Sequence, residues 1–104
     1  MARREFETLT PQMFYILLVL NVPRHGYEIM NEVSHITEGE VNIGAGTLYT
    51  LLPRFQTEGY IDLISIEDQK KIYQLTPLGK KKLQKEKVRI EKQLTLLEAI
   101  DYEV

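Results

Sequence analysis

The segment spanning residues 44–55 constrains the fold more than any other part of the sequence. Its apolar residues recur at intervals of three and four, a spacing that places side chains on one face of an α-helix. This inner stripe consists of Leu48, Leu51, Leu52 and Phe55. The opposite side carries a short polar row, Thr47, Thr50 and Arg54. We therefore predict a helix with one side in a core and a polar row that faces a partner.

Two further helices are predicted before this one. Thr10-Pro11 favours a helix start, because threonine can cap free amides and proline fits the first helical position. The run from Met13 to Leu20 is apolar throughout, so we expect its own domain or a second subunit to bury most sides. Pro23 interrupts the pattern, and a second helix is predicted from about Gly26 to His35.

The remainder of the chain predicts a β-hairpin and one more helix. Residues 41–43 alternate as a short strand or an extended link would, and Gly59 suits the end of the third helix. Residues 60–66 and 71–75 favour strands, and they flank the polar turn Glu67-Asp68-Gln69-Lys70. Thr76-Pro77 repeats the earlier helix start, and the last helix should reach about Ile100.

This order of elements is typical of a mainly α fold, the winged helix-turn-helix with a two-stranded β wing, followed here by a long C-terminal dimerisation helix. In such a fold the third helix enters the major groove of DNA and the hairpin lies beside it. We assign residues 1–76 to the winged helix body and residues 77–104 to the dimerisation helix, as one compact unit.

A regular seam runs along the last helix at alternating spacings of four and three. Its positions are Leu83, Lys87, Ile90, Leu94, Leu97, Asp101 and Val104. Five of these seven residues are apolar, which suits packing along another helix. At about 36 Å the helix is longer than the body that it leaves. We therefore expect its outer half to pack on a partner chain.

Composition excludes several classes of protein. The absence of cysteine excludes disulfides and thiolate sites, and His25 and His35 lack the spacing of metal ligands, so we expect no metal and no cofactor. No nucleophile elbow, phosphate loop or paired-carboxylate motif is present, and we predict that the protein is not an enzyme. The longest apolar run has eight residues, far fewer than the roughly 20 of a membrane span, and we expect a soluble cytoplasmic protein.

Charge is distributed unevenly along the chain. The net charge of −2 taken alone argues against a nucleic acid partner, yet seven of the 13 basic residues lie between Lys80 and Lys92. That run is either an electrostatic rail for DNA or a solvated helix face, and its place on the dimer helix favours the second interpretation. Lys70 and Lys71 at the hairpin tip indicate DNA contact or, alternatively, only solubility.

Short motifs in a fixed order link this chain to a known family. They are Gly26-Tyr27-Glu28-Ile29, Gly46-Thr47-Leu48-Tyr49 followed by Leu51-Leu52 and Arg54-Phe55, Glu58-Gly59-Tyr60-Ile61, and Tyr73-Gln74-Leu75-Thr76 with Gly79 and Leu83. As a set covering about residues 9–83, they resemble the PadR family of transcriptional regulators. The single helix after the wing resembles the short subgroup of that family.

The resemblance implies a homodimer that binds a pseudo-palindromic site in double-stranded DNA, represses transcription and is released by a small aromatic or drug-like effector. The predicted DNA-binding residues include the outer row of the third helix and a small residue from its start, together with those that the resemblance implies. They are Tyr27, Ala45, Thr47, Tyr49, Thr50, Arg54, Lys70, Lys71 and Tyr73. The predicted dimer interface is Phe14, Leu17, Leu83, Ile90, Leu94 and Leu97. Phe14 and Tyr15, with Phe6, line an effector pocket or are simply core and interface residues.

Two features depart from the family pattern. Pro53 removes a backbone donor inside the third helix, so we expect a kink or a break after Leu52. The hairpin tip is acidic at Glu67 and Asp68, which predicts weaker contact between wing and DNA. An alternative function is a winged-helix module that binds proteins and no DNA. A small-molecule carrier or enzyme in the dimer cavity has no motif in its support.

Overall fold

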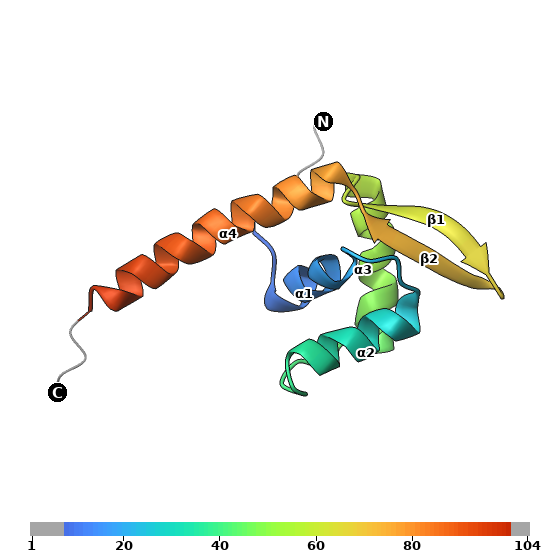
Figure 1. Cartoon of the computed structure of the whole chain (residues 1–104), viewed down its shortest axis with the longest axis horizontal. Coiled ribbons are helices and arrows are strands. Elements are labelled where there is room, and N and C mark those ends of the chain that lie inside the picture. The colour runs from blue at the N-terminus through green and yellow to red at the C-terminus, as the bar shows by residue number, and fades with distance from the viewer. Residues whose placement is uncertain (1–7, 101–104) are drawn as a thin grey trace.

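The computed structural model describes residues 8–100, which form four helices and one hairpin (Figure 1). The elements are α1 (Pro11–Val19), α2 (Gly26–Ile36), α3 (Ala45–Glu58), β1 (Ile61–Glu67), β2 (Lys70–Leu75) and α4 (Pro77–Glu98). The predicted winged helix-turn-helix is confirmed, with boundaries within about two residues of those expected. Residues 41–43 form an extended link and no strand. Phe6, Asp101 and Val104 lie outside the described residues.

The core forms where α1, α2, α3 and the base of the wing meet. Its fully buried side chains are Phe55, Ile16, Leu17, Leu20, Ile29, Leu48, Leu52, Ile61 and Val33. The predicted inner stripe of α3 is confirmed, because all four of its side chains are at most 6% exposed. Burial of each such side chain stabilises the fold by roughly 1.5–3 kcal/mol.

The dimer assignment of Leu17 is wrong. Its side chain is 0% exposed within a single chain, because it points from α1 into the core. Leu18, the next residue, is 39% exposed and lies on the outer face of the same helix. Since successive residues on a helix point about 100° apart, the uniformly apolar run hid which of the two faced outward.

Thr76 joins three elements at the base of the molecule. Its Oγ1 accepts a hydrogen bond from the Gly79 amide (3.0 Å), as Thr10 Oγ1 does from Met13 at the start of α1 (3.2 Å). Thr76 Oγ1 also donates to the Gly59 carbonyl at 2.5 Å, and its amide donates to the Tyr60 carbonyl at 2.9 Å. The end of α3, the start of β1 and the start of α4 are thereby held together.

Pro53 does not break α3, and the break expected after Leu52 is therefore wrong. The helix continues to Glu58 and ends at Gly59, whose φ of 82° is the left-handed conformation predicted there. A proline inside a helix costs about 3 kcal/mol or more. Leu52 and Phe55 are both fully buried on either side of Pro53, which itself lies exposed. Core packing on both sides therefore keeps the helix continuous.

The wing is an antiparallel pair whose register runs from Ile61 opposite Leu75 to Glu67 opposite Lys70, with an irregularity between Leu63 and Ser65. Two residues close its turn, Asp68 with φ 50° and Gln69 with φ 66°. Both values belong to the left-handed region, as a two-residue hairpin turn of type I′ requires.

A backbone bridge that the sequence did not predict ties the wing to the helical body. Arg24 and Tyr73 exchange two backbone hydrogen bonds, with N···O distances of 3.0 and 2.9 Å. The Leu75 amide also donates to the Leu20 carbonyl at 2.8 Å. The link between α1 and α2 therefore pairs with β2 at one residue, Arg24, outside the two-stranded sheet.

The long α4 leaves the body on the side away from the wing, and its distal end extends past the other helices (Figure 1). Within residues 8–100, no helix combines the length and the apolar character that crossing a membrane requires. The proposed division after Thr76 coincides with the step from β2 to α4 and remains a prediction.

Gly79→Ala should destabilise the protein by roughly 2–3 kcal/mol, because overpacking against rigid neighbours is costly. A Cβ at this position would lie 2.3 Å from the Tyr60 carbonyl oxygen and 2.6 Å from Leu75 Cδ1. Gly46→Ala is the matched control, since it also lies in the first turn of a helix but meets nothing within 4 Å. It should be neutral or stabilising by up to about 1 kcal/mol. Urea unfolding at equal protein concentrations measures both, and equal stability of the two variants would contradict the expectation.

Candidate nucleic-acid interface

The polar row of α3 lies on the surface, as the helical spacing predicted. Thr47, Thr50 and Arg54 are all exposed, and so is Ala45 in the first turn. Because α3 is continuous through Pro53, Arg54 lies on the same helix as the two threonines. Gly44 supplies no side-chain cap at the start of α3. Hydroxyl and guanidinium groups in this row can bond to base edges or to phosphates.

A hollow of about 440 Å³ lies between the start of α2, the middle of α3 and the tip of the wing. It is lined by His25, Gly26, Tyr27, Tyr49, Leu52, Pro53, Gln69, Lys70, Lys71 and Tyr73. The structure thus brings together five residues of the predicted DNA-binding set. Tyr27 and Tyr49 are 65% and 58% exposed, and Lys70 and Lys71 are also exposed.

Tyr73 is a correction to that set. Its side chain is only 6% exposed and belongs to the core at the base of the hollow. Burial, followed by the nearby Tyr49, raises the pKa of the Tyr73 phenol, which stays neutral. Tyr73 therefore supports the wing from beneath instead of facing outward.

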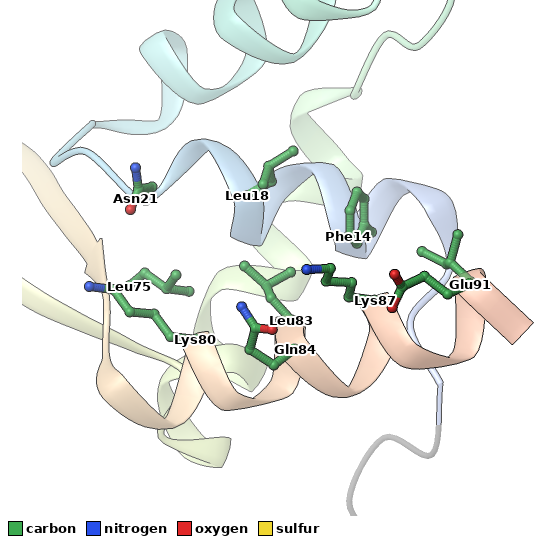
Figure 2. Close-up of a pocket in the computed structure, with 10 residues that line it drawn as sticks. Phe14, Leu18, Asn21, Leu75, Lys80, Leu83, Gln84, Lys87 and Glu91 are labelled. Atoms are coloured by element: carbon green, nitrogen blue, oxygen red, sulfur yellow. The ribbon is translucent and has the colours of Figure 1, made fainter.

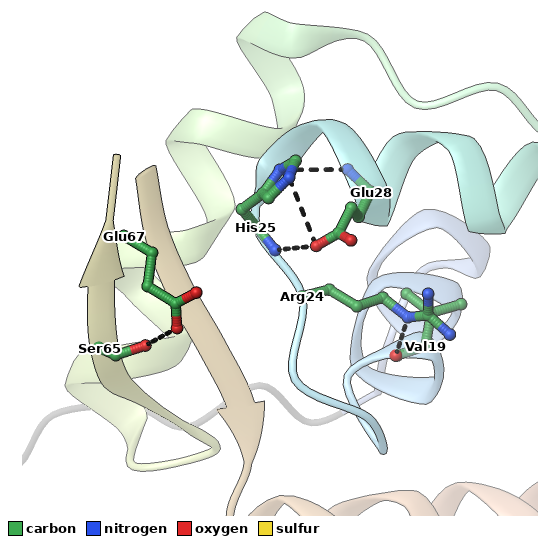
Figure 3. Close-up of polar contacts among 6 residues, drawn as sticks. All are labelled: Val19, Arg24, His25, Glu28, Ser65 and Glu67. Carbon is green, nitrogen blue, oxygen red and sulfur yellow. Dashed lines mark hydrogen bonds and ion pairs between the residues drawn. The ribbon is translucent and has the colours of Figure 1, made fainter. Parts of the chain in front are cut away.

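The start of α2 is fixed by polar contacts beside this hollow (Figure 3). His25 Nδ1 accepts from the Glu28 amide at 3.5 Å, and Glu28 Oε1 accepts from the His25 amide at 3.0 Å. Arg24 is occupied inside the protein, because its Nε donates to the Val19 carbonyl (2.9 Å) and its Nη2 lies 3.6 Å from Glu32. These contacts fix the start of α2 and bind Arg24 both to the end of α1 and to Glu32 of α2.

The model of the transcriptional regulator PadR-like family matches residues 16–85, more than half of the chain. The chain belongs to this family. The matched region runs from α1 to the first turns of α4 and includes the whole of the hollow and the polar row.

Solved structures of regulators share the fold. A transcriptional regulator from Clostridium thermocellum has a TM-score of 0.73 and 26% identity, over 82% of this chain and 87% of that one. RosR from H. salinarum has a TM-score of 0.66 and 26% identity, over 91% and 83%. Among curated sequences, uncharacterized protein X from Lysinibacillus sphaericus is 36% identical over 67 residues, 61% of this chain and 62% of that protein. The match therefore spans less than two thirds of that relative's length.

A second candidate site is an open groove of about 630 Å³ between α1 and α4 of this PadR-like chain (Figure 2). Its lining residues are Phe14, Leu18, Asn21, Leu75, Lys80, Leu83, Gln84, Lys87, Ile90 and Glu91. Three predicted interface residues, Phe14, Leu83 and Ile90, meet here. Tyr15 contacts Phe14 edge to face, with ring centroids 5.5 Å apart, but it lines a neighbouring hollow with Leu9 and Arg89.

The distal half of α4 exposes apolar side chains on more than one face. The predicted seam residues Ile90, Leu94 and Leu97 are 41%, 51% and 51% exposed. Val88 and Leu96, which the seam did not include, are 52% and 70% exposed and line a shallow groove of their own. Sequence spacing found only the first of these faces.

The interpretation of residues 80–92 as a solvated face holds only in part. Lys82 and Glu86 are buried, at 7% and 2% exposed. Glu86 Oε1 accepts from Arg89 Nη2 at 2.8 Å and from the Leu9 amide at 3.0 Å. This carboxylate fixes the segment before α1 to the middle of α4. The position of Glu86 one turn from both Lys82 and Arg89 was the only sequence signal for this buried ion pair, and we did not predict it.

The Glu86 contacts give the fold a dependence on pH. Burial alone would raise the pKa of Glu86, but hydrogen bonds from Arg89 and Leu9 and the charges of Arg89 and Lys82 outweigh it, so the pKa is lowered. A lowered pKa in the folded state means stability that is present above the ordinary pKa, near 4.5, and lost as the pH falls through the folded value.

Glu86→Gln keeps an acceptor for the Leu9 amide but removes the charge. We expect it to cost roughly 1–2 kcal/mol of unfolding free energy at pH 7. The difference from wild type should shrink as the pH falls below 4.5. Urea unfolding at pH 7, 5 and 3.5 measures it, and Glu40→Gln in an exposed loop is the control. A loss that did not depend on pH would show that the ion pair contributes nothing.

Proposed function

We propose that this PadR-like regulator is a dimeric, sequence-specific DNA-binding repressor that a small apolar effector releases. The observation that carries the proposal is the exposed row Thr47, Thr50 and Arg54 on α3, beside a hollow whose wing side presents Lys70 and Lys71. In the winged-helix arrangement α3 enters the major groove, and these side chains reach base edges and phosphates.

The wing of this protein contributes little electrostatic attraction. Lys70 and Lys71 lie on β2, but Glu67 and Asp68 stand at the tip and repel the backbone of DNA. Tyr27 lies exposed across the hollow, and its hydroxyl can bond to the same stretch of phosphates. We infer that the wing contacts phosphate along β2 and keeps its acidic turn away from the minor groove.

Dimerisation supplies the second half of the interface. The distal part of α4 carries Ile90, Leu94 and Leu97 at 41–51% exposure, more apolar surface than a solitary helix leaves in water. We infer that this exposed apolar face of α4 packs against the same part of a second chain. A two-fold dimer presents two α3 helices to half-sites about one turn of DNA apart, or a small multiple of that.

The groove between α1 and α4 suits an effector. Its volume of about 630 Å³ lies within the range for drug-sized ligands, roughly 300–1,000 Å³, and Phe14 offers a flat apolar wall. A planar apolar molecule bound there lies next to the dimer contact and can change the angle between the two α3 helices. Loss of repression then follows from the altered half-site spacing.

DNA recognition is tested by selecting a site from random duplexes and measuring affinity across a salt series. Arg54→Ala should weaken specific binding by about 1–3 kcal/mol. Lys71→Ala should weaken specific and non-specific binding alike and reduce the slope of log affinity against log salt by about 1. Lys85→Ala, an exposed lysine of α4, is the matched charge control. A reduced slope in that control would instead favour a DNA rail along α4.

If the wild-type protein selects no DNA sequence, the proposal is contradicted. The alternative function, a module that binds only proteins, would then remain. Tight specific binding that Arg54→Ala, Thr50→Ala and Lys71→Ala all leave unchanged would contradict the assignment of α3 as the reading helix.

The dimer interface is tested by sedimentation at micromolar concentration. Leu94→Lys combined with Leu97→Lys should convert a dimer into a monomer, because two charges would be buried without partners. Ile66→Lys makes the same change at a wing residue that is 62% exposed, and it should leave the dimer intact. A monomeric wild type, or a dimer that survives the double change, would show that α4 does not hold the subunits together.

A further inference from the structure

Gly26 leaves room for one particular side chain. It is the first residue of α2 and is buried. A Cβ at this position would lie 2.3 Å from Tyr49 Oη and 2.8 Å from Tyr49 Cζ. Among the described glycines only Gly39 and Gly59 have positive φ, so the backbone of Gly26 does not itself require glycine. The space that a side chain at position 26 would fill is therefore occupied by the Tyr49 phenol.

Tyr49 reaches this space from the neighbouring helix. It lies on α3 between Leu48 and Leu51, both of which point into the core, and its own ring is 58% exposed. The ring thus lies across the surface from α3 to the start of α2. Oη is the Tyr49 atom nearest to where a Gly26 Cβ would lie, so the end of the ring lies beside the first residue of α2.

The start of α2 is also the point at which the wing is attached. The double hydrogen bond between Arg24 and Tyr73 holds β2 two residues before Gly26. Tyr73 lines the same hollow as Tyr49 and Gly26. A displacement of α3 relative to α2 therefore also changes the distance between α3 and the wing.

We propose that Tyr49 is a positioning residue whose ring, seated on Gly26, sets the spacing between the polar row of α3 and the lysines of the wing. The inference rests on the proposed DNA-binding function and changes the role expected for Tyr49, from a DNA contact to a spacer. Groups that must meet one surface of DNA together lose affinity when their relative placement shifts, even if each remains present.

A mutant cycle between the two residues tests the contact. Gly26→Ala displaces the ring without altering Tyr49, and the fold should survive because only the end of a flexible side chain must move. We expect Gly26→Ala and Tyr49→Ala each to lower affinity for the selected site roughly tenfold, with the salt slope unchanged. The double variant should bind no worse than Tyr49→Ala, and Tyr49→Phe should stay within about twofold of wild type.

A second measurement needs no DNA. Amide hydrogen exchange at Arg24 and Tyr73 reports the bridge between α2 and the wing, and it should accelerate in Gly26→Ala and Tyr49→Ala but not in Tyr49→Phe. Tyr27→Ala is the matched control, because it removes another exposed tyrosine of the same hollow. It should weaken specific and non-specific DNA binding together and leave the exchange unchanged.

Three results would overturn the inference. Tyr49→Phe as damaging as Tyr49→Ala would mean that the hydroxyl contacts DNA. Additive losses in the double variant would mean that Gly26 and Tyr49 act independently. Unchanged exchange in both Gly26→Ala and Tyr49→Ala would mean that the ring positions nothing. If the wild type selects no DNA, the proposed function fails by itself, and the exchange measurement still decides whether Tyr49 holds α2, α3 and the wing in place.

Discussion

Burial of one face of α3 is the constraint on which the rest of the structure depends. Leu48, Leu51, Leu52 and Phe55 must all leave water, and their burial requires α1 and α2 on one side and the base of the wing on the other. The same arrangement leaves the Thr47, Thr50 and Arg54 row exposed on the surface. The core and the candidate reading face are therefore two sides of one helix, fixed by a single packing solution.

The features that local chemistry determines could be predicted from the sequence. Both threonine caps, the glycine at the end of α3 and the hairpin turn depend on residues within three or four positions of one another, and the structure confirms them. The inner stripe of α3 was predictable for the same reason, since helical periodicity alone assigns it.

The features that the sequence did not predict depend on contacts between distant segments. Nothing local says that Leu17 points inward and Leu18 outward, because both are leucines in an apolar run. Tyr73 is buried and its backbone pairs with Arg24, 49 positions earlier in the chain; Glu86 is buried and accepts a hydrogen bond from Leu9. Pro53 was assigned its intrinsic cost, but buried Leu52 and Phe55 hold the helix together across it. Packing between distant segments determined each of these side-chain positions, and the local sequence pattern does not contain that information.

The distribution of charge explains why geometry matters so much at the candidate interface. Arg24 and Arg89 are engaged inside the protein, Lys82 is buried, and Glu67 and Asp68 oppose the two lysines of the wing. Non-specific attraction between protein and DNA grows with the number of phosphates neutralised, so one protomer of this acidic chain gains little from it. In the proposed function, specific binding therefore depends on short-range contacts by correctly spaced groups and on two such faces acting together. The proposed spacing by Tyr49 within one face and the proposed pairing of two faces by α4 would supply these short-range contacts where net charge supplies little attraction.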